Sequence, residues 1–176
     1  MSIDSLKKFM PPPSVVNDGG DIDWSNIESE VKTILPDDYK QFISVYGTGA
    51  IGGFLWVLNP HSSNENLNLD KILYFHDAYF QMKELFPEEY KRPRFPEQGA
   101  FLTWAVSDNG DSLFWIVDGN DPNKWKVGIH DHDQGREELF PMGMTEFLVF
   151  LLENNLSSNI LPDDFTKSKI NNFETS

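Results

Sequence analysis

The hydrophobic positions between residues 35 and 58 predict a helix that leads into a buried strand. Four apolar side chains follow the spacing of one helix face: Tyr39, Phe42, Ile43 and Tyr46. Pro36 suits the first turn of this helix, and Gly47 suits the left-handed residue that ends it. The apolar run near residues 51–58 is typical of a buried strand. A capped helix that leads into a strand indicates an α+β domain.

Three further segments keep the 3.6-residue period of a helix. We expect one helix after Asp23, one from about Leu69 to Phe86 and one over about Thr145–Asn154. Asp23 and Ser25 are both candidate caps of the first of these helices. His76 lies on the apolar face of the second helix without an acidic or histidine neighbour four residues away, which indicates a structural role.

From residue 101 onward the period changes to two, which predicts strands. The four expected strands are separated by turn sequences and cover Phe101–Ser107, Ser112–Val117, Lys124–His130 and Arg136–Phe140. In the third strand, Trp125 and Val127 point to one side while Lys126 and His130 point to the other. We therefore expect one face of the sheet to be partly wet. In such a meander, alternate turns lie at the same end of the sheet.

The pattern divides the chain into an N-terminal arm (1–20), a domain (21–156) and a C-terminal tail (157–176). The arm carries a short helical pattern that the three prolines at 11–13 end. The tail is mostly polar. Within it, Ile160–Phe165 nearly repeats Ile34–Tyr39, and we interpret both segments as helix starts.

The glycines between Gly47 and Gly52 satisfy the dinucleotide-binding pattern G-x-G-x-x-G, and Asp70 lies at the distance of a ribose-binding acid. That mechanism needs a strand before the glycines and a helix after them, so that the helix N-terminus holds the pyrophosphate. Here the helix comes first and the strand second. The glycines therefore indicate a helix stop and a close approach of two backbones.

Composition limits the class of protein. The 176 residues are 39% hydrophobic and 14% aromatic, which is enough for one domain with a sizeable core. The absence of cysteine excludes disulfides, cysteine-ligated zinc and a thiol nucleophile. The first ten residues lack the apolar core of a secretory signal, and no run is long enough to span a membrane. We expect a cytoplasmic protein without membrane contact.

Charge adds a preference for certain partners. The sequence has 14 basic and 28 acidic residues, and its formal net charge is −14. Such a chain repels phosphate backbones, so direct binding to nucleic acid is disfavoured. The same charge attracts a basic partner and speeds its association.

The segment from His130 to Asp133 is the candidate for metal or catalytic chemistry. On an extended backbone His130 and His132 share a side, as zinc or iron would require. His61 and His76 do not supply a further ligand at a suitable spacing, and the sequence lacks a G-x-S-x-G elbow. We expect no cofactor and no enzymatic activity, and we keep a metal-dependent enzyme using His130 and His132 as a third hypothesis.

Acidic residues concentrate in the turns of the predicted meander, beside several tryptophans. Such a patch suits a basic protein surface, since tryptophan is enriched at the centres of interfaces. For Trp104 and Trp115, each considered by itself, we expect a position in the core. The residues that we predict to contact a partner, with Trp125 as an exposed aromatic, are Asp108, Asp111, Asp118, Asp121, Trp125, Asp131 and Asp133.

Three ordered motifs resemble the signature of the SUKH superfamily. The first is Leu35-Pro36-x-Asp38-Tyr39-x-x-Phe42-Ile43 ahead of a glycine-rich turn. The second runs from Asp108 to Trp115 as a Gly-Asp hairpin, and the third from Met144 to Leu148 opens the last helix. The similarity covers about residues 20–155.

The resemblance implies an α+β fold with a twisted, mainly antiparallel sheet of about five or six strands flanked by helices. It also implies a non-catalytic role, because bacterial members of this superfamily bind and block a co-encoded toxin, often a nuclease. We therefore expect an immunity protein whose partner is a cognate basic toxin. The alternative is a regulatory protein-interaction scaffold, like the related fungal cell-wall assembly regulator.

Overall fold

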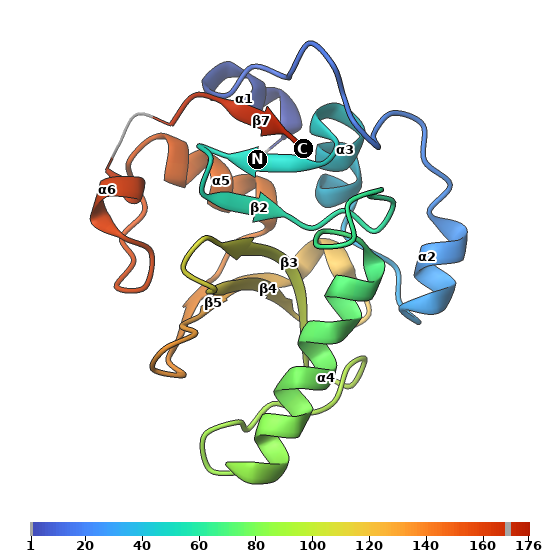
Figure 1. Cartoon of the computed structure of the whole chain (residues 1–176), viewed down its shortest axis with the longest axis vertical. Coiled ribbons are helices and arrows are strands. Elements are labelled where there is room, and N and C mark those ends of the chain that lie inside the picture. The colour runs from blue at the N-terminus through green and yellow to red at the C-terminus, as the bar shows by residue number, and fades with distance from the viewer. Residues whose placement is uncertain (1, 168–169) are drawn as a thin grey trace.

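One sheet of seven antiparallel strands forms the centre of the computed structural model, which describes residues 2–167 and 170–176 (Figure 1). The strands are β1 (Gly49–Ile51), β2 (Leu55–Val57), β3 (Phe101–Ser107), β4 (Ser112–Ile116), β5 (Lys126–His130), β6 (Glu137–Phe140) and β7 (Phe173–Thr175). Their spatial order is β6-β5-β4-β3-β2-β1-β7, so β1 to β6 form a continuous meander. The predicted α+β fold with a mainly antiparallel sheet is confirmed.

The described residues also form helices around this sheet. They are α1 (Ile3–Phe9), α2 (Ser25–Glu30), α3 (Asp37–Tyr46), α4 (Leu69–Leu85), α5 (Met144–Leu152), α6 (Asp163–Thr166) and the 3-10 turn η1 (Pro122–Lys124). The helix starts predicted after Pro36 and Pro162 are both confirmed. Trp24 occupies the N-cap position of α2 without a side-chain cap, and the carboxylate of Asp23, one residue earlier, accepts the backbone N–H of Ser25 at 3.0 Å.

The apolar run at 51–58 differs from the single strand expected there. It contains the end of β1 and all of β2, joined by Gly52 and Gly53 with φ angles of 60° and 65°. Glycine adopts these left-handed values without strain, so the chain turns back after three residues. Gly49 lies so close to β7 that an added Cβ would stand 2.1 Å from the carbonyl oxygen of Glu174. Gly52 and Gly53 thus form the turn, and Gly49 allows the close contact between β1 and β7.

The first face of the sheet carries the main core, against α1, α3 and α5. The Tyr39 ring of α3 packs edge-on against Trp115, with ring centroids 5.0 Å apart. Phe147 of α5 packs edge-on against Trp104 at 6.2 Å. The buried Tyr39 hydroxyl donates a hydrogen bond of 2.6 Å to the carbonyl oxygen of Leu58. Large aromatic side chains therefore join the helices to the strands.

The segments predicted as a peripheral arm and a polar tail are part of this core. Leu6 and Met10 in the N-terminal segment are both 0% exposed, and the Tyr46 hydroxyl donates to the Met10 carbonyl at 2.6 Å. In the C-terminal segment, Phe173 is buried against Phe42 and Tyr46, and β7 pairs with β1. Both segments therefore contribute side chains to the core, because residues far away in the sequence bury their few apolar side chains.

The second face of the sheet is covered by α4 alone among the described helices, and only in part. Tyr79 of α4 packs on Phe101 of β3 at 4.7 Å, and Phe101 in turn contacts Phe114 of β4 at 5.5 Å. The C-terminal half of α4 projects beyond the strands, as the green helix in Figure 1 shows. The prediction of a partly wet face is confirmed on this side.

Candidate functional site

The β3–β4 turn and the β5–β6 turn lie side by side, as expected for alternate turns of a meander. The backbone N–H of His132 donates to the carboxylate of Asp111 at 3.2 Å and links the two turns. Asp118 and Asp121 belong to the β4–β5 connection at the opposite end of the sheet. There they form ion pairs with Lys126 at 3.7 Å and with Lys124 at 3.2 Å.

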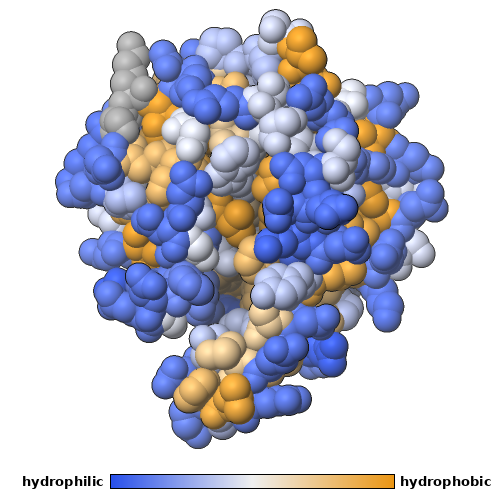
Figure 2. Space-filling model, viewed as in Figure 1, coloured by the Kyte–Doolittle hydropathy of each residue, from blue (hydrophilic) through white to orange (hydrophobic). Residues whose placement is uncertain are grey.

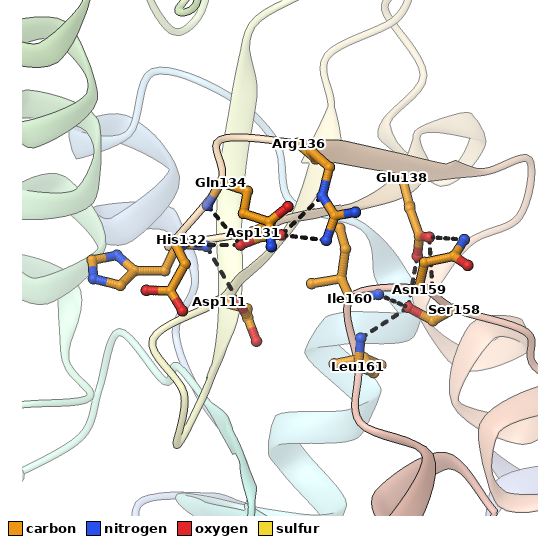
Figure 3. Close-up of polar contacts among 11 residues, drawn as sticks. Asp111, Asp131, His132, Gln134, Arg136, Glu138, Ser158, Asn159, Ile160 and Leu161 are labelled. Atoms are coloured by element: carbon orange, nitrogen blue, oxygen red, sulfur yellow. Dashed lines mark hydrogen bonds and ion pairs between the residues drawn. The ribbon is translucent and has the colours of Figure 1, made fainter.

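Asp111 and Asp131 are buried and hold the turns together (Figure 3). Asp111 accepts a hydrogen bond from the Ser107 hydroxyl at 2.8 Å. Asp131 pairs with Arg136 at 2.9 Å and accepts the backbone N–H of Gln134 at 3.0 Å. Burial raises the pKa of Asp131, but the bonds from Arg136 and the turn amides outweigh it and leave this pKa below its ordinary value. These two carboxylates are occupied by internal contacts.

Asp108 and Asp133 are the exposed acids of the same two turns. One carboxylate oxygen of Asp108 accepts the indole N–H of Trp56 at 2.7 Å, which fixes the side chain at the surface. Within residues 2–167 and 170–176, no hydrogen bond or ion pair holds the Asp133 carboxylate. These two side chains are therefore the acids at this edge that a partner can reach.

The expectation that Trp125 is an exposed aromatic is wrong. Its side chain is only 3% exposed, and Trp104 and Trp115 are buried as well. Trp125 precedes β5 and points to the same side as Val127, which is the core face. The alternation of the strand predicts which residues share a side, but it does not predict which side faces the helices.

Exposed apolar side chains gather instead on α4 and the residue after it. Four of the eight large exposed hydrophobic residues in the described chain lie there: Tyr74 (59% exposed), Met82 (36%), Leu85 (70%) and Phe86 (45%). Figure 2 shows hydrophobic residues at the projecting end of this helix. In the sequence, this exposed apolar surface corresponds to a second apolar stripe at residues 74, 78 and 82. It runs beside the buried stripe that contains Ile72 and Tyr79.

A groove of about 300 Å³ separates α4 from the uncovered part of the second sheet face. We call it the α4 groove and define it by six of its lining residues: Tyr74, Tyr79, Met82, Phe101, Phe114 and His130. The ring of Phe114 extends over Gly128 on the next strand, where an added Cβ would stand 2.5 Å from the ring. Gly128 therefore leaves the room that the Phe114 ring occupies on the floor of the groove, where the guanidinium of Arg92 lies 5.5 Å from the ring centroid.

Two of the histidines, His76 and His130, are held mainly by packing against aromatic rings. His76 is buried between Phe95 and Phe101, with its ring stacked 5.1 Å from the ring of Phe101. Burial lowers its pKa from 6.5 to about 4, against the opposing charge of Asp77. Burial likewise lowers the pKa of His130, although the nearby Glu137 acts in the other direction. In the described part of the chain, no group of three or more histidine, aspartate or glutamate side chains is placed to hold a metal ion.

The three ordered sequence motifs meet in space. Asp38 of the first motif accepts the backbone N–H of Thr145 of the third at 2.9 Å, so it caps α5 from a neighbouring helix. Tyr39 of the first motif packs on Trp115, which ends the second. Asp38, Tyr39 and Trp115 of these motifs thus build the junction between α3, α5 and the sheet, whereas Asp108, Gly110 and Phe114 of the second motif lie at the exposed turn or along the α4 groove.

Comparison with known families identifies this architecture. The sequence model of the SUKH_6 family, described as SMI1-KNR4 cell-wall, matches residues 21–148, well over half of the chain. The chain belongs to the SUKH superfamily. No curated protein and no solved structure gave a match to this SUKH protein. The matched range contains the acidic turns and the α4 groove, while α1, α6 and β7 lie outside it.

Among the helices of residues 2–167 and 170–176, none is both long and apolar enough to cross a membrane.

Proposed function

We propose that this protein is an immunity protein that binds a cognate bacterial toxin and neutralises it by covering it, without catalysis. Membership of the SUKH superfamily supports a role in protein binding, since its bacterial members are thought to block co-encoded toxins. In this proposal the toxin is basic and of the nuclease type, because such an enzyme carries positive charge where it holds nucleic acid.

The observation that carries the proposal is the excess of negative charge. With 28 acidic and 14 basic residues, at least half of the acids have no basic side chain of this chain to neutralise them. Asp108 and Asp133 are exposed in adjacent turns, and Gly110 and His132 of the same turns line an apolar groove. Charge around an apolar centre is the usual composition of a protein interface, and it steers an oppositely charged partner into place.

Co-expression tests the proposal. The product of the neighbouring open reading frame is expressed in cells with and without this protein, and survival is measured together with complex formation between the purified chains. We expect the neighbouring product to be toxic alone and harmless when this chain binds it. A neighbouring product that is harmless alone, or that stays toxic in the presence of this chain, would disprove the proposal.

The regulatory scaffold is a second candidate, and the family description as SMI1-KNR4 cell-wall favours it. A scaffold is expected to bind several signalling proteins, whereas an immunity protein has one tight partner. Affinity purification of the intact chain under its native promoter separates the two roles. Several substoichiometric partners in the absence of any toxin-protection phenotype would support the scaffold.

A further inference from the structure

Strand register defines which part of the second sheet face stays open. Across β4, β5 and β6, Phe114 pairs with Gly128, and Gly128 pairs with Leu139. Paired residues of antiparallel strands point to the same side, so these three positions share the face that α4 covers only in part. Phe114 is covered, but Leu139 is 54% exposed. The apolar face thus continues beyond the helix into solvent.

The α4 groove has one apolar wall on the helix and an apolar floor on the sheet. Tyr74 and Met82, eight residues apart, form the outer part of the helical wall. Phe101 and Phe114 form the floor, where both rings contact each other beneath Tyr79. An exposed tyrosine and methionine beside buried phenylalanines are the residue types that protein interfaces favour.

The mouth of the groove lies at the two acidic turns. Gly110 of the β3–β4 turn and His132 of the β5–β6 turn both line the groove, and their close approach leaves only 3.2 Å between an added Cβ and the imidazole. Asp108 and Asp133 belong to the same turns and are exposed. The two acidic turns therefore adjoin the apolar groove at Gly110 and His132, and Asp133 lies one residue further on, where it lines a second hollow with Arg136 and Ile160.

We propose that the α4 groove and these two turns form the docking site for a basic protein segment. An apolar or aromatic side chain of the partner enters the α4 groove, and neighbouring lysine or arginine side chains face Asp108 and Asp133. The inference rests on the proposed function for the identity of the partner and specifies which surface that partner covers. Asp118 and Asp121, at the opposite end of the sheet, lie outside the contact.

Charge selects this occupant over a second copy of the chain. Two copies would bring net charges of −14 together, and the same repulsion applies to a nucleic acid strand. A basic segment gains from the same field. The described N- and C-terminal segments do not compete for the groove, because α1 and β7 are packed into the core and the sheet.

Matched substitutions test the groove. The first pair is Tyr74→Arg, in the groove, and Ile34→Arg, outside it. The two residues are matched in exposure, at 59% and 60%. Met82→Arg and Val16→Arg form a second pair, at 36% and 38% exposure. Each change adds one positive charge, so the difference within a pair reports position alone. We expect the groove variants to weaken binding at least about tenfold and the controls less than about twofold.

A third pair tests the acidic edge. Asp133→Asn and Asp118→Asn remove the same charge from opposite ends of the sheet. The inference predicts weaker binding for Asp133→Asn by about threefold to tenfold and a smaller effect for Asp118→Asn. Equal effects of the two changes would contradict the assignment of the acidic edge, since a diffuse field does not distinguish the two ends.

The probe in each titration is the purified product of the neighbouring open reading frame, measured by calorimetry, and the melting temperature of each variant checks its folding. Hydrogen exchange on the wild-type complex gives a readout that needs no variant. It is expected to show protection over residues 74–82 and in both acidic turns.

The outcomes separate this inference from the proposed function. A toxin that is bound and neutralised with equal affinity by groove and control variants, or that protects other surfaces, overturns the inference and leaves the immunity function standing. A wild-type chain that fails to bind the probe overturns both.

Discussion

Asp38 connects two helices that are more than a hundred residues apart in the sequence. Its carboxylate lies in the first turn of α3 and accepts the backbone N–H of Thr145 in the first turn of α5. The N-cap position of α5 is Gly143, which has no side chain to supply this bond. A carboxylate from a neighbouring helix therefore satisfies one of the free amides.

This cap predicts different costs for two adjacent acids. Asp38→Ala removes the part-buried bond from Thr145, whereas Asp37→Ala removes an exposed bond of 2.9 Å from the side-chain amide of Asn123. We expect Asp38→Ala to lower the free energy of unfolding by about 1 kcal/mol more than Asp37→Ala. Both changes remove an acid from the first turn of α3, so the helix-dipole contribution cancels. Urea unfolding of both variants measures the difference. Equal costs would mean that the cap contributes no more than the exposed bond between Asp37 and Asn123.

His76 predicts a pH dependence of stability. Its pKa falls from 6.5 in the unfolded chain to about 4 in the fold, because burial disfavours the charged ring. Between these values the unfolded state binds the proton more tightly, so stability is full above pH 6.5 and falls on acidification toward pH 4. The loss amounts to about 3 kcal/mol at most.

His76→Phe tests this dependence, because phenylalanine can keep the stacking on Phe101 without titrating. We expect the variant to lose less stability than the wild type between pH 6.5 and pH 4. His130 and the depressed acids titrate in both proteins, so the difference between the two unfolding curves isolates the contribution of His76. A pH profile identical to that of the wild type would refute it.

At the scale of elements, the periodicity of the chain predicted α3, α4, α5 and the strands β3 to β6 within a few residues. These elements have strong local signals: a helical stripe with caps, or alternation bounded by turn residues. β1, β2 and β7 have only three residues each, which is too short for a period to be visible. They form because a neighbouring strand supplies their hydrogen bonds.

The terminal strand β7 predicts a measurable cost of truncating its one buried side chain. Phe173→Ala removes an aromatic ring that packs on Phe42 and Tyr46, and we expect the free energy of unfolding to fall by about 3 kcal/mol. Thr175→Ala in the same strand changes an exposed side chain and is expected to cost less than about 0.5 kcal/mol. Chemical denaturation compares the two. A negligible cost at Phe173 would show that β7 is peripheral.

At the scale of the molecule, charge and shape act together in the proposed complex. The net charge of −14 belongs to the whole chain, whereas the apolar groove occupies one side of it. Long-range attraction brings a basic partner near, and the groove and its acidic mouth then orient it. We expect the long-range attraction to set the association rate and the contacts in the groove to set the dissociation rate.

Salt provides that separation. The association rate with the product of the neighbouring open reading frame is expected to fall roughly tenfold as ionic strength rises from about 20 mM to about 500 mM. The dissociation rate should change much less, because it depends on close contacts in the groove. Surface plasmon resonance over a salt series measures both rates. A salt-independent association rate would exclude electrostatic steering.

At the candidate site, the sequence predicts which turns are neighbours but not which side chains are exposed. The side-by-side placement of the two acidic turns followed from the meander, but Asp111 and Asp131 turned out to be buried and bonded internally. A turn aspartate has the same local sequence whether it faces inward or outward. The α4 groove was missed altogether, because the second apolar stripe of α4 has meaning only beside an uncovered sheet face.

The sequence by itself determined the main helices, the meander, the net charge and the family, because these follow from local periodicity, turn chemistry and ordered motifs. Tertiary structure alone decided that Trp125 is buried, that both terminal segments belong to the core and that one side of α4 stays open. Those properties depend on contacts between residues far apart in the chain. No local pattern contains the position of a distant neighbour.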